Sequence, residues 1–325
     1  MFRSLAAHGI PFVRFSAGGY WPLEWYLYRT NRDAHFQRLD AVIHAAERAG
    51  IGLIPSLFWH PPTLSDLAGE PFQDWGHRES KTFALMQAYT REVIQRYRDS
   101  QAVWAWEFGN EFNLPADLPN AAEHRPPVVP HAGTPTTRSA HDELTHAAFR
   151  TALSGFAEEA RRWDARRLLL SGNAFPRSSA WHQLHHQTWD LDSREQWTAM
   201  LLDDHPAPIS CLSGRLYSAD DLHQLPWAAA AARATHRPLF IGEFGVPGRL
   251  DDPALARFQE QLDALDTHEI PLAALWVVDF DGQAADWNVT EANARAPLLR
   301  LLEQRNRTWR AAQAAAAAPP LPKTP

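Results

Sequence analysis

The chain has 325 residues, a formal net charge of −7 and one cysteine, Cys211. A chain of this length can bury the core of one large α/β domain, so a second independent domain is not expected. Its lysines and arginines are dispersed, which argues against a nucleic-acid surface, and no apolar run reaches the length of about 18 residues that a membrane span needs. A single cysteine excludes an internal disulfide framework and leaves a secreted or a cytoplasmic location open.

The first half of the chain alternates strand and helix patterns. A helical pattern that ends at Gly9 leads into an apolar strand over residues 10–15. An aromatic loop is followed by an amphipathic helix over 33–50, a strand over 51–59 and a helix over 80–98. The run Val-Trp-Ala-Trp-Glu-Phe-Gly-Asn-Glu-Phe-Asn at 103–113 is typical of a buried strand that carries Glu111 at its end.

The second half repeats this alternation after a long proline-rich loop, which is expected above a cleft. We predict helices over 139–163, 193–204, 227–235, 253–268 and 296–309, and strands over 168–171, 209–213, 239–243 and 272–279. The spacing between strands leaves room for crossover helices, which indicates an α/β protein of the (β/α)8 TIM-barrel type.

The predicted barrel is incomplete at its N-terminus. Seven strands are found where a closed barrel takes eight, and the chain starts where the helix after a first strand would end. We therefore expect the first strand, and any signal peptide, to lie upstream of Met1, because the sequence comes from a truncated gene model or a fragment. The catalytic barrel is predicted to cover residues 1–310, and the alanine- and proline-rich residues 311–325 to form a disordered tail.

Two acids lie at the ends of two predicted strands, Glu111 and Glu243 in Pro-Leu-Phe-Ile-Gly-Glu-Phe-Gly. Parallel barrels place these strand ends at one face, so the two carboxyl groups are expected in one cleft. Cleavage of a glycosidic bond needs such a pair, since one acid protonates the leaving oxygen and the other attacks the anomeric carbon or activates water. The alternatives are a solvated loop acid for Glu111 and an interior salt bridge for Glu243.

The two motifs together resemble glycoside hydrolase clan A, and within it the cellulase-like glycoside hydrolase family 5, over roughly residues 10–309. The resemblance implies that Asn110 binds the sugar 2-hydroxyl, that Glu111 is the general acid/base and that Glu243 is the nucleophile. The implied activity is retaining hydrolysis of a β-linked glucan, mannan or related oligosaccharide by double displacement, which requires no cofactor.

Other positions match substrate-binding residues of that family. By the same resemblance Arg14 lies beside the nucleophile, His60 near the catalytic sugar subsite and Trp276 under the sugar at the cleavage point, and the Tyr217 hydroxyl touches the nucleophile. Each also has a structural alternative. Arg14 is suited to an interior ion pair with Glu107, His60 to a role within its loop, and Trp276 to the core.

Arg215 departs from the family pattern, which usually has histidine two residues before the tyrosine. In Ser213-Gly214-Arg215-Leu216-Tyr217 a permanent cation replaces an imidazole that can be neutral. Such a cation would lower the pKa of the nucleophile, bind an acidic or unusual sugar, or mark a site that has lost its activity. We count Arg215 among the substrate-binding candidates.

Fourteen tryptophans exceed the needs of a core of this size, and tryptophan stacks on sugar rings. Six of them, in loops of the predicted catalytic face, are candidates for sugar stacking: Trp21, Trp25, Trp59, Trp75, Trp181 and Trp189.

Two other classes of function stay open. The missing strand and Arg215 fit a non-catalytic carbohydrate-binding barrel. His182, His185 and His186 have helical spacing that fits a metal-dependent hydrolase, but no Cys, Asp or Glu completes a site near them in the sequence, so no metal is assigned. The expected partner of this chain, a monomer, is an oligosaccharide or polysaccharide, not nucleic acid or a membrane.

Overall fold

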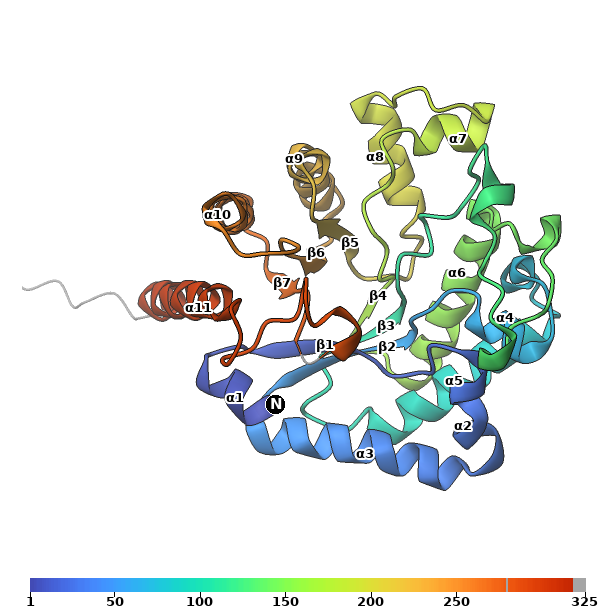
Figure 1. Cartoon of the computed structure of the whole chain (residues 1–325), viewed down its shortest axis with the longest axis horizontal. Coiled ribbons are helices and arrows are strands. Elements are labelled where there is room, and N and C mark those ends of the chain that lie inside the picture. Colours follow the sequence, from blue (N-terminus) through green and yellow to red (C-terminus); the bar gives the residue numbers. More distant parts are fainter. Residues whose placement is uncertain (279, 318–325) are drawn as a thin grey trace, which may run out of the picture.

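The computed structural model describes residues 1–278 and 280–317, which form a ring of helices around parallel strands (Figure 1). The strands are β1 (Phe12–Ser16), β2 (Gly52–Phe58), β3 (Ala105–Gly109), β4 (Leu168–Leu170), β5 (Leu212–Leu216), β6 (Leu239–Phe244) and β7 (Leu272–Leu275). The main helices are α1 (Phe2–Ala7), α3 (Arg32–Ala49), α5 (Lys81–Tyr97), α6 (His146–Trp163), α8 (Arg194–Asp203), α9 (Ala219–Thr235), α10 (Asp252–Thr267) and α11 (Ala296–Ala317).

Shorter helices lie in the connections between these elements. They are α2 (Tyr26–Thr30), α4 (Thr63–Ala68), α7 (Ala180–His186) and the 3-10 turns Pro22–Trp25, Phe72–Gly76, Ala121–His124, Pro130–Ala132, Ala140–Asp142 and Asp281–Gln283. None of the helices in the described residues is both long and apolar enough to cross a bilayer.

All strand pairs are parallel, and they form the sheets β1-β2-β3-β4 and β5-β6-β7. A backbone hydrogen bond of 2.8 Å from Ser210 to Leu169 links the two sheets. This arrangement confirms the predicted α/β barrel class, because the chain returns to each parallel strand through an outer helix. The carboxyl ends of β3 and β6 therefore lie at the same face of the barrel.

The barrel is open between β1 and β7, which have no strand partner on their outer edges among the described residues. β2, β3, β5 and β6 are buried along their whole length, whereas most residues of β1 and all of β7 are partly exposed. Seven strands are present in the described residues. That a further strand precedes Met1 in the complete protein stays a prediction.

Several predicted boundaries were wrong for identifiable reasons. α9 begins well before residue 227, because Ser218 and Asp221 form a capping box and the buried Leu225 and Ala228 hold the helix across Pro226. α6 begins only after Thr145, whose side chain caps it. β5 lies at 212–216 rather than 209–213, and β7 ends before residues 276–279, the last of which lies outside the described residues.

The prediction of disorder was wrong for residues 311–317, the first part of the predicted tail. α11 continues through them to Ala317. This stretch is rich in alanine, which has the highest helix propensity. Residues 318–325 lie outside the described residues.

Candidate active site

Both predicted acids lie in one cavity of 1450 Å³ at the carboxyl ends of the strands. Asn110 and Trp276 also line it, as the sequence predicts for substrate-binding residues. The cavity continues between β1 and β7, where apolar side chains such as Leu262 form its wall. The cavity therefore extends from the two acids into the open edge of the barrel between β1 and β7.

Glu111 projects from a tight turn after β3. Its backbone is left-handed, with φ 56°, a conformation that costs a residue with a side chain about 1 kcal/mol. The Glu111 N–H donates to the Gly172 carbonyl at 3.0 Å. A Cβ atom on Gly172 would lie 1.8 Å from the Gly109 carbonyl oxygen, so only glycine allows this approach of the two loops.

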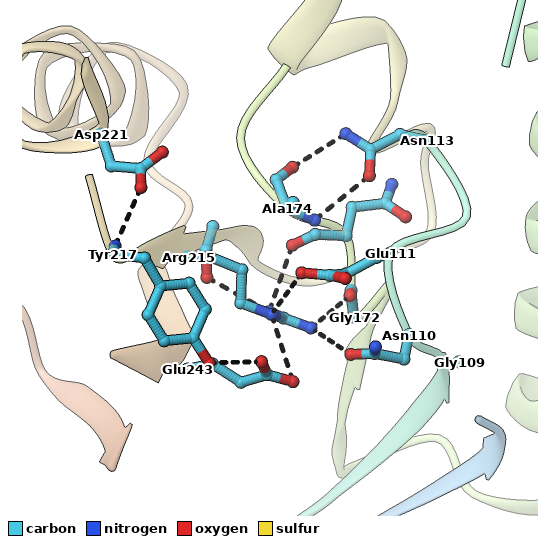
Figure 2. Close-up of polar contacts among 12 residues, drawn as sticks. Gly109, Asn110, Glu111, Asn113, Gly172, Ala174, Arg215, Tyr217, Asp221 and Glu243 are labelled. Carbon is cyan, nitrogen blue, oxygen red and sulfur yellow. Dashed lines mark hydrogen bonds and ion pairs between the residues drawn. The ribbon is translucent and has the colours of Figure 1, made fainter. Parts of the chain in front are cut away.

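The Asn113 side chain fixes the same pair of loops. It donates to the Ala174 carbonyl at 2.9 Å and accepts from the Ala174 N–H at 3.1 Å (Figure 2). The loop after β4 therefore holds the turn that carries Glu111, and the strained backbone directs the carboxyl group into the cavity.

Glu243 lies within β6, where side chains from β1 and from the end of β5 bind it. Arg14 Nη1 donates to Oε1 at 2.7 Å, and the Tyr217 hydroxyl donates to Oε2 at 2.7 Å. Arg215 Nε lies 3.4 Å from Oε1. Burial alone would raise the pKa of Glu243, but the two guanidinium groups and the hydroxyl outweigh it and hold this pKa below its usual range. Glu243 is therefore ionised, as a nucleophile requires.

Glu111 has the opposite protonation behaviour. Burial raises its pKa, Arg215 at 3.6 Å lowers it, and the charge of Glu243 raises it again, so that the pKa stays above its usual range. At a pH between the two pKa values Glu111 is protonated and Glu243 is ionised. This is the combination that acid/base and nucleophile roles need.

The two carboxyl groups also lie close together. Arg215 Nε is 3.6 Å from an oxygen of Glu111 and 3.4 Å from an oxygen of Glu243, which places these oxygens within about 7 Å of each other. Retaining glycosidases hold their carboxyl groups about 5 Å apart and inverting ones about 6.5–9.5 Å apart. The limit applies to the two nearest oxygens rather than to the carboxyl groups as a whole, so this geometry admits either range. Figure 2 shows both groups directed at Arg215.

Arg14 has both of the contacts that the sequence suggests. Its Nε donates to Glu107 at 2.7 and 3.0 Å, while Nη1 binds Glu243. Its Nη2 donates to the Asn110 side-chain oxygen at 2.9 Å, and Arg215 donates to the same oxygen at 2.7 Å. These polar side chains therefore form one buried cluster with the two acids.

His60 lies behind the wall of this cavity. Its ring stacks on Tyr20 with centroids 4.5 Å apart and contacts Trp21, and these two aromatic residues line the cavity. Burial lowers the pKa of His60 to about 4, so the ring is neutral. His60 is thus placed to support an aromatic wall; its proposed contact with sugar stays a prediction.

The tryptophan candidates divide into two groups. The prediction was wrong for Trp25 and Trp75, which are 1% and 0% exposed because they pack edge-on against Tyr89 and Phe108 in the core.

The other four tryptophan candidates have exposed surface. Trp21 and Trp59 line the main cavity, and Trp59 stacks on Trp276 at 5.8 Å. Trp189, 51% exposed, lines a second cavity of 410 Å³ beside Glu111, and Trp181 packs against the histidines of α7.

The histidines of α7 line neither of the two cavities. One acid approaches them, since His182 Nδ1 lies 2.7 Å from Asp192. Among the described residues, however, no group of three His, Cys, Asp or Glu side chains is arranged to hold a metal ion.

Asp221 and Gly242 also shape the site and were not predicted from the sequence. Asp221 accepts from the N–H groups of Tyr217 and Ser218 at 2.8 and 2.7 Å and so fixes Tyr217; the capping box Ser218-x-x-Asp221 would have pointed to it. Gly242 makes room for Arg215, because a Cβ atom there would lie 2.3 Å from its Nη1. A glycine inside a strand is the signal for such an approach.

Parallel strands, outer helices and paired acids at strand ends define a (β/α) barrel with a glycosidase-like site. No protein-family model matches the chain. A segment of 82 residues is 42% identical to the probable mannan endo-1,4-β-mannosidase A-2 of Aspergillus terreus. This match covers 23% of the chain and 20% of that relative, so the matched part spans about a fifth of the relative's length.

Solved structures extend the similarity to nearly the whole chain. The endo-1,4-β-mannanase from Rhizomucor miehei has a TM-score of 0.66 at 15% identity, over 95% of this chain and 89% of that one. GH5_18 from Streptomyces cattleya, in complex with GlcNAc, has a TM-score of 0.62 at 18% identity, over 100% and 74%. The resemblance to glycoside hydrolase family 5 predicted from the motifs is thereby confirmed, and the chain has the fold of these enzymes.

Proposed function

We propose that this protein is a retaining β-glycoside hydrolase that cleaves O-glycosidic bonds of a β-mannan or a related β-linked oligosaccharide. The observation that carries the proposal is geometric: Glu111 and Glu243 line one cavity and lie 3.6 and 3.4 Å from the same Arg215 Nε. The opposite directions of their pKa shifts, up for Glu111 and down for Glu243, support it. The names of the mannanases that resemble the chain favour mannan over glucan.

Each residue of the cluster has a role in this proposal. In the first step a Glu243 oxygen attacks the anomeric carbon, the bond to the leaving oxygen breaks, and Glu111 gives its proton to that oxygen. In the second step water attacks the same carbon, the ester to Glu243 breaks, and Glu111 takes the proton of the water. Arg14 and Tyr217 hold the Glu243 oxygens during both steps. Two carboxyl groups suffice for this chemistry, so no cofactor is invoked.

The two cavities fit the two sides of a scissile bond. The sugar that reacts would lie in the main cavity against Trp276, and Asn110 would bind its 2-hydroxyl. The leaving group would lie in the smaller cavity, which shares Glu111 with the first and has Trp189 in its wall. A proton donor at the junction of the two cavities is positioned for the oxygen that joins the two sugars.

The test is turnover of aryl β-mannosides, aryl β-glucosides and manno-oligosaccharides by the parent chain. We expect hydrolysis with net retention, read by NMR of the first product anomer, and a preference for the manno series. A matched control is Glu260→Ala, which removes an exposed carboxyl group of α10 and leaves turnover at the parent level. Product of inverted configuration would refute the double displacement.

A non-catalytic carbohydrate-binding barrel is the second candidate, favoured by Arg215 and by the open edge between β1 and β7. It predicts that the folded chain binds manno-oligosaccharides, measured by calorimetry, without releasing product. Turnover by the parent that Glu243→Ala abolishes would exclude it.

A further inference from the structure

Arg215 occupies an unusual place between the two acids. It is buried, and its Nε lies 3.6 Å from Glu111 and 3.4 Å from Glu243. This Nε is a buried donor without a hydrogen bond to any described residue, so it is not committed to either carboxyl group. The geometry fits a cation that is shared between the two acids.

The rest of the side chain is held firmly. Nη2 donates to the Gly172 carbonyl at 2.6 Å and to Asn110 at 2.7 Å, and Nη1 donates to the carbonyls of Asn173 and Gly214 at 3.3 and 3.2 Å. Gly242, next to the nucleophile, leaves the space that Nη1 occupies. A guanidinium with this many fitted contacts is a built part of the site, which argues against a decayed one.

The charges of the cluster balance in the state that starts the reaction. Arg14 and Arg215 are permanent cations. With Glu111 protonated, the two negative charges of Glu107 and Glu243 match them. With a neutral side chain at position 215 the same state would carry one uncompensated buried negative charge, which is costly.

We propose, on the basis of the glycosidase function above, that Arg215 is a positioning residue that serves as a shared counter-ion for whichever of Glu111 and Glu243 is ionised. In the first step the negative charge of Glu243 is consumed in the bond to the anomeric carbon, and Glu111 becomes negative as its proton leaves with the leaving group. In the second step Glu111 takes a proton from water and becomes neutral again, and Glu243 regains its negative charge as its bond to the anomeric carbon breaks. The net charge around Arg215 stays constant while the negative charge moves from one of its neighbours to the other.

The consequence is an acid-shifted working range. A permanent cation near both acids lowers both pKa values, so that the nucleophile stays ionised and the acid/base loses its proton at lower pH than with a neutral neighbour. The other groups that set these values are Arg14, Arg177, Tyr217 and Asp221, which remain unchanged in the test.

The decisive variant is Arg215→Gln, with Arg215→Met, which is also neutral, as the second variant in case the first does not fold. We expect both limbs of the pH profile of kcat/KM for an aryl β-mannoside to move to higher pH by about one unit. A ¹³C-carboxyl NMR titration, with Glu111→Gln and Glu243→Gln used for assignment, should show both apparent pKa values rising equally far. Arg215→Lys, which keeps the charge, should leave them near the parent values.

Arg237→Gln is the matched control, because Arg237 also donates to backbone carbonyls, those of His205, Ile209 and Cys211, but lies away from the acids. Loss of stability alone would lower its melting temperature and leave the titrations in place. Unmoved titrations in Arg215→Gln and Arg215→Met, or an equal shift in Arg215→Lys, would overturn the shared counter-ion. Failure of the proposed function is a separate result, since it would appear as no turnover by the parent chain while the titration is still measurable.

Discussion

The ends of β3 and β6 present the same side chain to one cavity in different ways. Glu243 lies inside its strand, with a side chain that is 8% exposed, and is reached by Arg14 and by Tyr217. Glu111 lies in a left-handed turn beyond its strand, is 32% exposed, and has Arg215 as its nearest cation. The position relative to the strand end thus decides how many donors reach a carboxyl group, and the number of donors decides which acid is ionised.

The largest effect is expected for Glu243, the acid with the most donors. Glu243→Ala removes the proposed nucleophile and should lower kcat by about 10⁴-fold or more for every substrate, whatever its leaving group. The measurement is turnover of aryl β-mannosides that differ in leaving-group pKa, at constant pH. Glu260→Ala is the control for the loss of a carboxyl group. Activity of Glu243→Ala near the parent level would mean that Glu243 is not the nucleophile, so that the proposed difference between the two acids is wrong.

Glu111 should show a smaller effect that depends on the leaving group. Glu111→Ala removes general acid catalysis, which contributes about 10²–10⁴-fold, but a good leaving group departs without a proton. We expect a large loss of kcat/KM for methyl or oligosaccharide leaving groups and little loss for dinitrophenyl. Azide, which needs no general base, should restore the second step and give a β-glycosyl azide. An α-azide, or an equal loss for all leaving groups, would contradict the assignment.

Tyr217 sharpens the comparison, because among the described residues its hydroxyl hydrogen-bonds to Glu243 and not to Glu111. A hydrogen bond to a charged group contributes about 1.5–3 kcal/mol, so Tyr217→Phe should lower kcat/KM by about 10- to 100-fold. Activity needs Glu243 ionised and Glu111 protonated. It therefore falls as the pH drops through the lowered pKa of Glu243 and as it rises through the raised pKa of Glu111. Tyr217→Phe should move the acid limb to higher pH and leave the alkaline limb nearly unchanged.

The sequence was sufficient for the barrel and for the pair of acids, because both depend on local patterns. Strand and helix periods alternate along the chain, and an acid at each of two strand ends follows from parallel topology. The burial of Trp25 and Trp75 was not predictable in this way. Trp25 packs against Tyr89 of α5 and Trp75 against Phe108 of β3, so only the assembled fold shows that these rings belong to the core.

The structural details that determine the charges of the two acids could not be predicted from the sequence either. Nothing local in Asn-Glu-Phe-Asn indicates a left-handed Glu111, since that conformation depends on Gly172 from another loop. Arg215 stands out in the sequence as a departure from the family pattern, but its similar distances from the two acids, 3.6 and 3.4 Å, depend on the register of β5 against β6, which shifts between Gly214 and Arg215. A register shift of this kind is set by packing across the sheet.

The smallest expected effect concerns the backbone of the same turn. Both Glu111→Ala and Glu111→Gly remove the carboxyl group, but only glycine adopts φ 56° without strain, so Glu111→Gly should exceed Glu111→Ala in free energy of unfolding by about 1 kcal/mol. Urea unfolding of the two variants measures this difference. At Glu260, exposed in the middle of α10, the order should reverse by about the same amount, because glycine destabilises a right-handed helix relative to alanine. If the alanine variant were the more stable one at both positions, the turn after β3 would have to relax once the carboxyl group is gone. The left-handed backbone of Glu111 would then result from contacts of its side chain and not from the loop itself.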